Sequence, residues 1–345
     1  MMKEHKIGYS FIVLASVFIV LAGIKSASVI IIPFLLSLFI AIILSPFYNF
    51  FKHKRVPEFL SVLIVISLFV LFLALVGKLI GTSMTDFSAN INMYTEKLKH
   101  FFDTSFLYTK DLGFNFTAEE FMGFADPKRI MTFGTSILQG MSSLFTNGFI
   151  IVLTVIFMLI ESQHFEDKIE FADSSKEKIS SIKEIASKIQ NYMVIKAIIS
   201  LFTGFIIWMA LFFIGTDYAF LWGVLAFLFN FIPNIGSIIA AVPAVFITLV
   251  QLGSMSAFFV VLLYGIVNIV IGSIIEPKVM GRGLGLSTLV VFLSLLFWGW
   301  LLGIVGMLLS IPLTIMAKIV LDSNKNTKWI AVLLGSGEKL IEREN

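Results

Sequence analysis

Long apolar runs alternate with shorter polar segments over most of the chain. A helix of about 20 apolar residues is long enough to cross the hydrocarbon core of a bilayer. Runs of this kind predict membrane-spanning helices at about 8–24, 28–47, 58–80, 147–162, 194–214 and 257–275. The chain is therefore predicted to be an all-α polytopic membrane protein with about six full crossings.

Two further apolar segments, 220–250 and 286–320, are longer than one crossing needs and are interrupted. The interruptions are Asn230, Pro233, Asn234 and Gly236 in the first segment, and Trp298-Gly-Trp300, Gly303 and Gly306 in the second. Backbone that leaves the helix at membrane depth is tolerated only where it is buried in protein or lines a wet cavity. Because broken helices of this kind form the binding sites of many secondary transporters, we expect a site near these breaks.

The distribution of positive charge predicts how these segments are oriented. Lys and Arg gather in cytoplasmic loops. With both termini in the cytoplasm, the predicted topology leaves all but seven of the 25 Lys and Arg residues inside. The loop 276–285, which contains Lys278 and Arg282, stays inside only if 220–250 is a re-entrant hairpin. The segment 286–320 then also returns to its own side, which gives two hairpins in an inverted arrangement.

A weak internal similarity agrees with an inverted repeat. Leu228-Phe229 precedes Pro243 with Gly236 between them, and Leu296-Phe297 precedes Pro312 with Gly306 between them. Chance recurrence in an apolar chain is the alternative explanation. The charge distribution therefore carries more of the argument for the two hairpins.

Two polar segments interrupt the membrane pattern. Residues 81–146 contain acidic residues and an apolar helical stripe that includes Phe87 and Tyr94, and they predict a small extracytoplasmic helical insert. Residues 163–193 predict a cytoplasmic amphipathic helix that continues into the next crossing. The predicted organisation is a three-span segment 1–80, the insert 81–146, the fourth span 147–162, the amphipathic helix 163–193, a transport core 194–320 and a cytoplasmic tail 321–345.

Composition supports the membrane class and gives no sign of an active site. Hydrophobic residues make up 58% and charged residues 14% of the chain, and the mean hydropathy is +0.98, values far from those of soluble domains. There is no Cys, and no two of the four His residues stand at helical spacing for a zinc site. Phosphate-binding loops and catalytic Ser–His pairs within the spans are also absent. We expect no enzyme activity, catalytic residue, metal site or cofactor.

Polar side chains at membrane depth are costly and therefore candidates for function. Asn230 and Asn234 flank Pro233, which frees backbone carbonyls, so their amides either cap the broken helices or bind a polar solute. Asn268 either makes an interhelical hydrogen bond or belongs to the same site. The residues predicted for solute binding are Asn230, Pro233, Asn234, Gly236, Asn268, Gly303 and Gly306.

Charged residues in the spans have two interpretations as well. Glu276 either pairs with Lys278 or Arg282 at the inner interface or couples transport to H⁺ or Na⁺. Lys196, near the start of its span, is expected to extend its ammonium group to the aqueous interface.

Three ordered motifs resemble the autoinducer-2 exporter (AI-2E) family of bacterial inner-membrane permeases, and the resemblance covers essentially the whole chain. They are Asn230-Phe-Ile-Pro-Asn-Ile-Gly-Ser-Ile-Ile-Ala-Ala-Val-Pro243, Ile275-Glu-Pro-Lys-Val-Met-Gly-Arg-Gly-Leu-Gly-Leu286 and Gly303-Ile-Val-Gly-Met-Leu-Leu-Ser-Ile-Pro312. Asn234 and Ser237 stand where the family usually has an aromatic residue and a proline, and Ser287-Thr288 where it commonly has His-Pro. These departures make the first hairpin tip of this chain more polar.

The resemblance implies a multi-pass protein of the bacterial cytoplasmic membrane that exports a small polar metabolite, with the quorum-sensing signal autoinducer-2 as the founding example. Some relatives are described as Na⁺ or Li⁺/H⁺ antiporters, which makes antiport through Glu276 the first alternative. A non-transporting membrane scaffold is the second. The expected partners are the solute, H⁺ or Na⁺, the lipid bilayer and further copies of the chain in a homo-oligomer, without nucleic acid. The sequence does not specify the solute, the coupling ion, the oligomeric state or the role of the insert.

Overall fold

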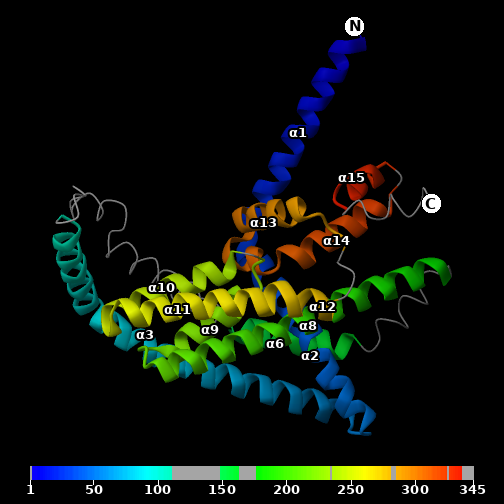
Figure 1. Ribbon diagram of the computed structural model, residues 1–345. Coiled ribbons are helices and arrows are strands. Elements are labelled where there is room, and N and C mark those ends of the chain that lie inside the picture. Colours follow the sequence, from blue (N-terminus) through cyan, green and yellow to red (C-terminus); the bar gives the residue numbers. More distant parts are fainter. Residues whose placement is uncertain are drawn as a thin grey trace. The chain divides into compact units, whose positions relative to one another are not determined.

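The computed structural model describes residues 2–110, 148–162, 176–233, 235–280, 285–324 and 326–335, and all regular structure in these residues is helical. Figure 1 labels most of the helices. In chain order they are α1 (Met2–Ser26), α2 (Ser28–His53), α3 (Glu58–Lys110), α6 (Gly148–Glu161), α8 (Lys176–Ile214), α9 (Ala219–Phe229), α10 (Gly236–Leu252), α11 (Ser254–Val267), the π-helix η1 (Asn268–Ile275), α12 (Glu276–Met280), α13 (Thr288–Leu308), α14 (Ser310–Asp322) and α15 (Lys328–Leu333).

The helices agree with the prediction of an all-α membrane protein. Five described stretches are long and apolar enough to cross a membrane: Ser28–His53, Glu58–Tyr94, Ala186–Ile214, Ser254–Met280 and Thr288–Leu308. The expected first span, 8–24, lies within α1. The expected span at 147–162 corresponds to α6, whose 14 residues are fewer than a full crossing usually needs. The number of full crossings, and whether the broken segments are re-entrant, stay predictions.

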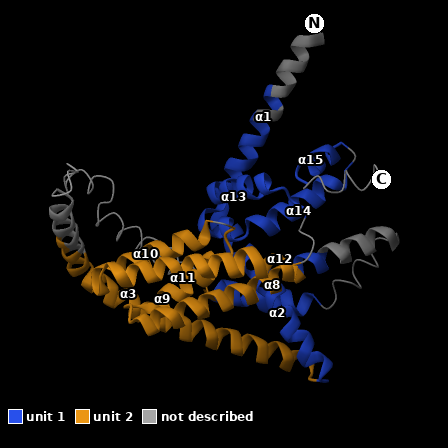
Figure 2. Cartoon of the chain, viewed as in Figure 1, with its two compact units in different colours: residues 1–55, 149–190, 284–345 blue, residues 56–148, 191–283 orange. Residues whose placement is uncertain are grey.

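The chain divides into two compact units, which Figure 2 distinguishes by colour. Unit 1 comprises residues 1–55, 149–190 and 284–345, and unit 2 comprises residues 56–148 and 191–283. The broken segment 220–250 falls in unit 2, and the broken segment 286–320 falls in unit 1. Two segments for which the sequence predicts the same role are therefore built into different units.

Unit 2 is built around α10. This helix packs along α9 and α11, and the long helix α3 packs against α9 and α10, as Figure 1 shows. Lipid chains are as apolar as Leu, so close side-chain packing rather than burial from water holds such helices together. The side chains without solvent exposure in this core include Ile207, Leu211, Leu221, Trp222, Ala240, Ala244, Ile247 and Val260.

Helix α3 continues without a break from the expected third span into the first part of the expected insert, as far as Lys110. Two residues of the predicted stripe, Phe87 and Tyr94, are buried. Phe87 meets the Trp222 ring edge-on, with 6.0 Å between centroids. The Tyr94 hydroxyl donates a hydrogen bond to the Asp217 carboxylate at 2.7 Å. This part of the insert thus packs on the start of α9, while residues 111–147 lie outside the described residues and the extracytoplasmic location stays a prediction.

Unit 1 joins the beginning of the chain to its end. Helix α13 packs against α1, α2 and α14, and α14 packs against α15. The fully buried Ser37 on α2 donates a hydrogen bond to the Ile151 carbonyl of α6 at 3.2 Å. The Lys25 ammonium lies 4.5 Å from the centroid of the Trp300 ring, which is a cation–π contact. The second broken segment therefore packs against the N-terminal helices.

Candidate functional site

The first broken segment loses its helix between Phe229 and Gly236. Pro233 has no N–H, so the Phe229 carbonyl lacks the donor that a continuous helix would give it. The Ile232 N–H donates to that carbonyl instead, at 2.8 Å, and the Phe231 N–H donates to the Leu228 carbonyl at 3.2 Å. Both bonds join residues three apart, so α9 ends in a tightened turn.

Gly236 lets α10 begin directly against the end of α9. A Cβ atom at this position would lie 1.7 Å from the Phe229 carbonyl oxygen, far inside contact distance. Only glycine fits there. Pro233 and Gly236 thus act together, because the proline ends one helix and the glycine brings the next one close. Asn234, which stands between them, lies outside the described residues.

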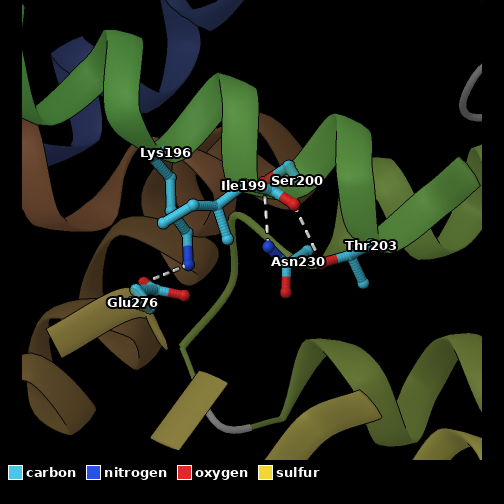
Figure 3. A network of polar contacts seen from close by, with 6 residues as sticks. All are labelled: Lys196, Ile199, Ser200, Thr203, Asn230 and Glu276. Carbon is cyan, nitrogen blue, oxygen red and sulfur yellow. Dashed lines mark hydrogen bonds and ion pairs between the residues drawn. The ribbon is translucent and has the colours of Figure 1, made fainter. Parts of the chain in front are cut away.

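Asn230 connects the break to α8. Its side-chain amide donates a hydrogen bond to the Ser200 hydroxyl at 2.9 Å, as Figure 3 shows. Ser200 is fully buried, and Asn230 is half-buried. The side-chain oxygen of Asn230 has no hydrogen-bond partner in the described part of the chain. The amide therefore keeps hydrogen-bonding capacity at the break.

Asn268 begins a π-helical turn. Helices α11, η1 and α12 form one continuous stretch from Ser254 to Met280. The Glu276 N–H bonds to the Ile271 carbonyl, five residues back, and Pro277 cannot donate at all. π-helical turns are rare and occur frequently at functional sites. The widened turn thus lies between the candidate residues Asn268 and Glu276.

A small cavity brings two of the predicted asparagines together. It lies between α8, α9, α10 and α11 and is lined by Thr203, Ile207, Ala226, Asn230, Ser237, Tyr264, Val267 and Asn268. Asn230 and Ser237 are half-buried and Asn268 is exposed, whereas Thr203 and Tyr264 are buried. The cavity volume is about 10 Å³, roughly what one water molecule requires.

Lys196 and Glu276 form an ion pair inside unit 2. The Lys196 ammonium lies 2.5 Å from a Glu276 carboxylate oxygen, with side chains only 4% and 18% exposed, and Figure 3 shows the two groups pointing at each other. The prediction that Lys196 extends to the aqueous interface is wrong, because its charge is neutralised within the fold. Glu276 pairs with Lys196 rather than with Lys278, whose side chain is exposed. Arg282, the other predicted partner, lies outside the described residues.

The second broken segment is built with the same device in unit 1. Helix α13 is interrupted at Gly303, whose φ of 65° and ψ of −148° suit glycine alone. A Cβ atom at Gly306 would lie 2.0 Å from the Trp298 carbonyl oxygen. The Trp298 indole donates to the Thr314 hydroxyl of α14 at 2.9 Å. Glycines thus permit both the break in α13 and the close return of the chain.

The predicted site residues divide between the units. Asn230 and Asn268 share the cavity, Pro233 and Gly236 shape the break beside it, and Glu276 belongs to the same unit. Gly303 and Gly306 belong to unit 1. The residues that sequence reasoning missed are Thr203, Ser237, Tyr264 and, as the partner of Glu276, Lys196.

A signal for part of this set was present in the sequence. Lys196, Ser200 and Thr203 stand at i, i+4 and i+7 in an apolar run. That spacing places them on one face of a helix. A polar stripe of this kind in a membrane-spanning segment indicates a face that turns away from lipid.

Comparison with known proteins extends the similarity over nearly the whole chain. A family model described as "AI-2E family transporter" matches residues 11–326. The AI-2 transport protein TqsA of Escherichia coli strain K12 is 39% identical over 95% of this chain and 96% of its own length. A putative transport protein of Haemophilus influenzae is 44% identical over 94% and 95% of the two chains. One from Borreliella burgdorferi is 30% identical over 98% and 94%. Both broken segments fall within these matches.

Proposed function

Because this chain belongs to the AI-2E transporter family and is a multi-pass bacterial membrane protein, we propose that it exports a small polar metabolite of the autoinducer-2 kind. The Escherichia coli relative is named an AI-2 transport protein, which fits a role in quorum sensing. Family membership favours transport over the alternative of a passive scaffold. Transport without chemical change of the solute is part of the proposal.

The observation that carries the proposal is the polar cavity at the break between α9 and α10. Polar groups of a solute lose their hydrogen bonds to water at membrane depth and need partners from the protein. Asn230 and Asn268 offer amides at one cavity. We propose that they form the solute site with Asn234 and with the backbone that Pro233 and Gly236 shape. Gly303 and Gly306 stay site predictions that rest on the sequence pattern.

The size of the cavity implies that the break moves during transport. A volume of about 10 Å³ holds roughly one water molecule and cannot hold a metabolite. The described conformation is thus closed around the site. Residues 230–233, which lie outside regular helix, are the segment that we propose opens to admit the solute.

A vesicle assay tests this function. Wild-type protein in sealed vesicles is expected to move autoinducer-2 across the membrane, whereas protein-free vesicles do not. Asn230→Ala should raise the apparent KM, because one hydrogen-bonding group of the site is lost. Asn90→Ala is the matched control. Asn90 lies on α3, and its side-chain amide donates a hydrogen bond to the Tyr218 hydroxyl at 3.3 Å, outside the cavity. Absence of autoinducer-2 flux in wild-type vesicles would reject this solute.

A second candidate function is exchange of Na⁺ or Li⁺ for H⁺, and the buried Lys196–Glu276 pair favours it. A carboxylate in this position could bind a cation or a proton in place of the Lys196 ammonium. Ionisable residues at membrane depth commonly mark such pathways. Under an imposed pH gradient, Glu276→Gln should then abolish cation exchange.

The control for this candidate is the charge-reversed double variant, Lys196→Glu with Glu276→Lys, which keeps the ion pair and exchanges its ends. If Glu276 binds the ion, the double variant folds but loses normal exchange. An unchanged exchange rate and pH profile in Glu276→Gln would remove the antiport candidate. Wild-type vesicles without any cation exchange would remove it as well.

Topology and assembly complete the proposal. The chain has no Cys, so single introduced cysteines report their side of the membrane without background. Lys54→Cys and Lys278→Cys should be labelled from the cytoplasm and Ser254→Cys from outside, all three positions being exposed. Labelling of Lys278→Cys and Lys54→Cys from opposite sides would contradict the re-entrant hairpin. The proposed homo-oligomer is tested by the mass of the protein in detergent.

A further inference from the structure

Tyr264 of α11 has a buried hydroxyl with no hydrogen-bond partner. The residue is 6% exposed, and its hydroxyl oxygen has no partner among the described residues. A buried polar group without a partner is destabilising, so its presence in a native fold calls for an explanation. Tyr264 lines the same cavity as Asn230 and Asn268. The cavity is therefore lined by a residue whose hydroxyl makes no hydrogen bond within the described fold.

The size of the cavity and its remaining hydrogen-bonding capacity suit a single hydroxyl group. The volume of about 10 Å³ is roughly that of one water-sized group. The Thr203 hydroxyl donates to the Ile199 carbonyl at 2.9 Å and so keeps only acceptor capacity. The Asn230 amide has one N–H on Ser200 and retains a second N–H and its oxygen. Together with the unused hydroxyl of Tyr264, the lining residues have both donors and acceptors, which is what a hydroxyl group can use.

The electrostatic character of the cavity selects for a neutral group. All eight lining residues are uncharged. Lys196 and Glu276 neutralise each other and do not line the cavity. An ionised carboxylate, phosphate or ammonium group would lose its hydration there without a counter-charge. A neutral, hydroxylated solute would not meet this penalty.

We propose that this cavity is a hydroxyl-recognition subsite, in which Tyr264 hydrogen-bonds one hydroxyl group of a neutral solute while the rest of the solute lies beside the opened residues 230–233. This inference rests on the proposed export function and gives it a solute class. Tyr264 is then a specificity-determining residue, because it distinguishes solutes that carry this hydroxyl from those that lack it.

The test removes the hydrogen bond from the protein and from the solute in turn. Apparent KM values are measured in vesicles for autoinducer-2 and for analogues that each lack one of its hydroxyl groups, with wild type and Tyr264→Phe. Wild type should bind one of the analogues roughly 2- to 12-fold more weakly than autoinducer-2, the range expected for one neutral hydrogen bond. Tyr264→Phe should bind that analogue and autoinducer-2 equally well. If the variant keeps the wild-type preference against every analogue, the subsite is rejected.

Melting temperatures in detergent keep the inference testable even if autoinducer-2 is not the solute. Glycerol, erythritol and ribose, as neutral hydroxylated probes, should raise the melting temperature of wild type more than that of Tyr264→Phe, while lactate and ethanolamine have no such differential effect. Without solute, Tyr264→Phe should melt at the same temperature as wild type or higher, because it removes an unpartnered polar group. A failed vesicle assay with a positive melting result would reject autoinducer-2 and keep the subsite.

The matched control is Tyr94→Phe. It makes the same chemical change at a tyrosine whose hydroxyl bonds to Asp217 at 2.7 Å, outside the cavity. This variant should melt at a lower temperature and keep the wild-type response to the probes. Two results would overturn the inference: destabilisation of solute-free Tyr264→Phe as large as that of Tyr94→Phe, or stabilisation of wild type by Na⁺ alone that Tyr264→Phe abolishes.

Discussion

The two broken segments share a backbone design and differ in the side chains around it. In each, a glycine lies against the carbonyl of a residue seven or eight positions earlier: Gly236 against Phe229 and Gly306 against Trp298. The segment 220–250 contains two Asn residues, whereas 286–320 contains no Asn, Gln, Asp or Glu. The second segment has instead an indole–hydroxyl bond between Trp298 and Thr314 and a buried hydroxyl, Ser310, without a partner in the described chain.

This difference separates two properties that a broken helix can have. Proline and glycine create the break, because they remove a donor or permit close backbone approach. Amides and hydroxyls beside the break create a site, because they can replace the hydration of a solute. We therefore propose that segment 220–250, the one of the two that has amides beside its break, binds the solute, and that segment 286–320 contributes backbone near Gly303 and Gly306.

The largest loss of stability is expected for variants of the Lys196–Glu276 ion pair, which belongs to unit 2. Removing one partner of a buried pair leaves an uncompensated charge and costs about 3–5 kcal/mol. Glu276→Gln should destabilise the protein more than Lys196→Met. The first variant leaves the Lys196 charge unpaired in a side chain that is 4% exposed, whereas the second leaves the Glu276 charge in a side chain that is 18% exposed. The double variant should recover most of the loss. Melting temperatures of the three variants measure this order, and a double variant as unstable as Glu276→Gln would contradict it.

Glycine replacements should affect both segments alike. Gly236→Ala and Gly306→Ala each force a Cβ atom against backbone, and overpacking of this kind costs about 1–3 kcal/mol or more. Gly265→Ala is the control, because its Cβ would meet nothing within 4 Å and alanine favours the helix. Thermal unfolding of all three variants tests the shared backbone design. Tolerance of alanine at only one of the two positions would show that the designs differ.

A smaller effect is expected for the hydrogen bond that closes the second segment. Thr314→Val removes the acceptor of the Trp298 indole and should cost roughly 1 kcal/mol of stability. Transport affinity should not change, because this bond joins α13 to α14 and neither residue lines the proposed solute cavity. Unfolding and vesicle transport of the same preparation provide both values. A raised KM in Thr314→Val would show that side chains of unit 1 also take part in solute binding.

The sequence predicted the helical class, the breaks and the family, and it predicted less about partners. Apolar length and Pro or Gly positions act locally, so the interruptions near Pro233 and at Gly303 could be placed from the chain alone. The interruption predicted at Trp298-Gly-Trp300 is wrong, because these residues stay helical within α13. The pairing of Lys196 with Glu276 joins residues 80 apart in the sequence and depends on how α8 meets α12. Tyr264 was missed for a similar reason: its ring fits an apolar run, and only the packing reveals that its hydroxyl lacks a partner.

The most direct test of the account compares Asn230→Ala with Thr314→Val in one transport assay, because each variant removes a polar group beside one of the breaks. If the first segment binds the solute, Asn230→Ala raises the apparent KM by about 5- to 150-fold, since a polar group of the solute loses its partner at a cost of roughly 1–3 kcal/mol. Thr314→Val leaves the KM unchanged. An unchanged KM in Asn230→Ala, together with a lowered melting temperature, would show that its amide only braces α9 against α8 and would contradict the account.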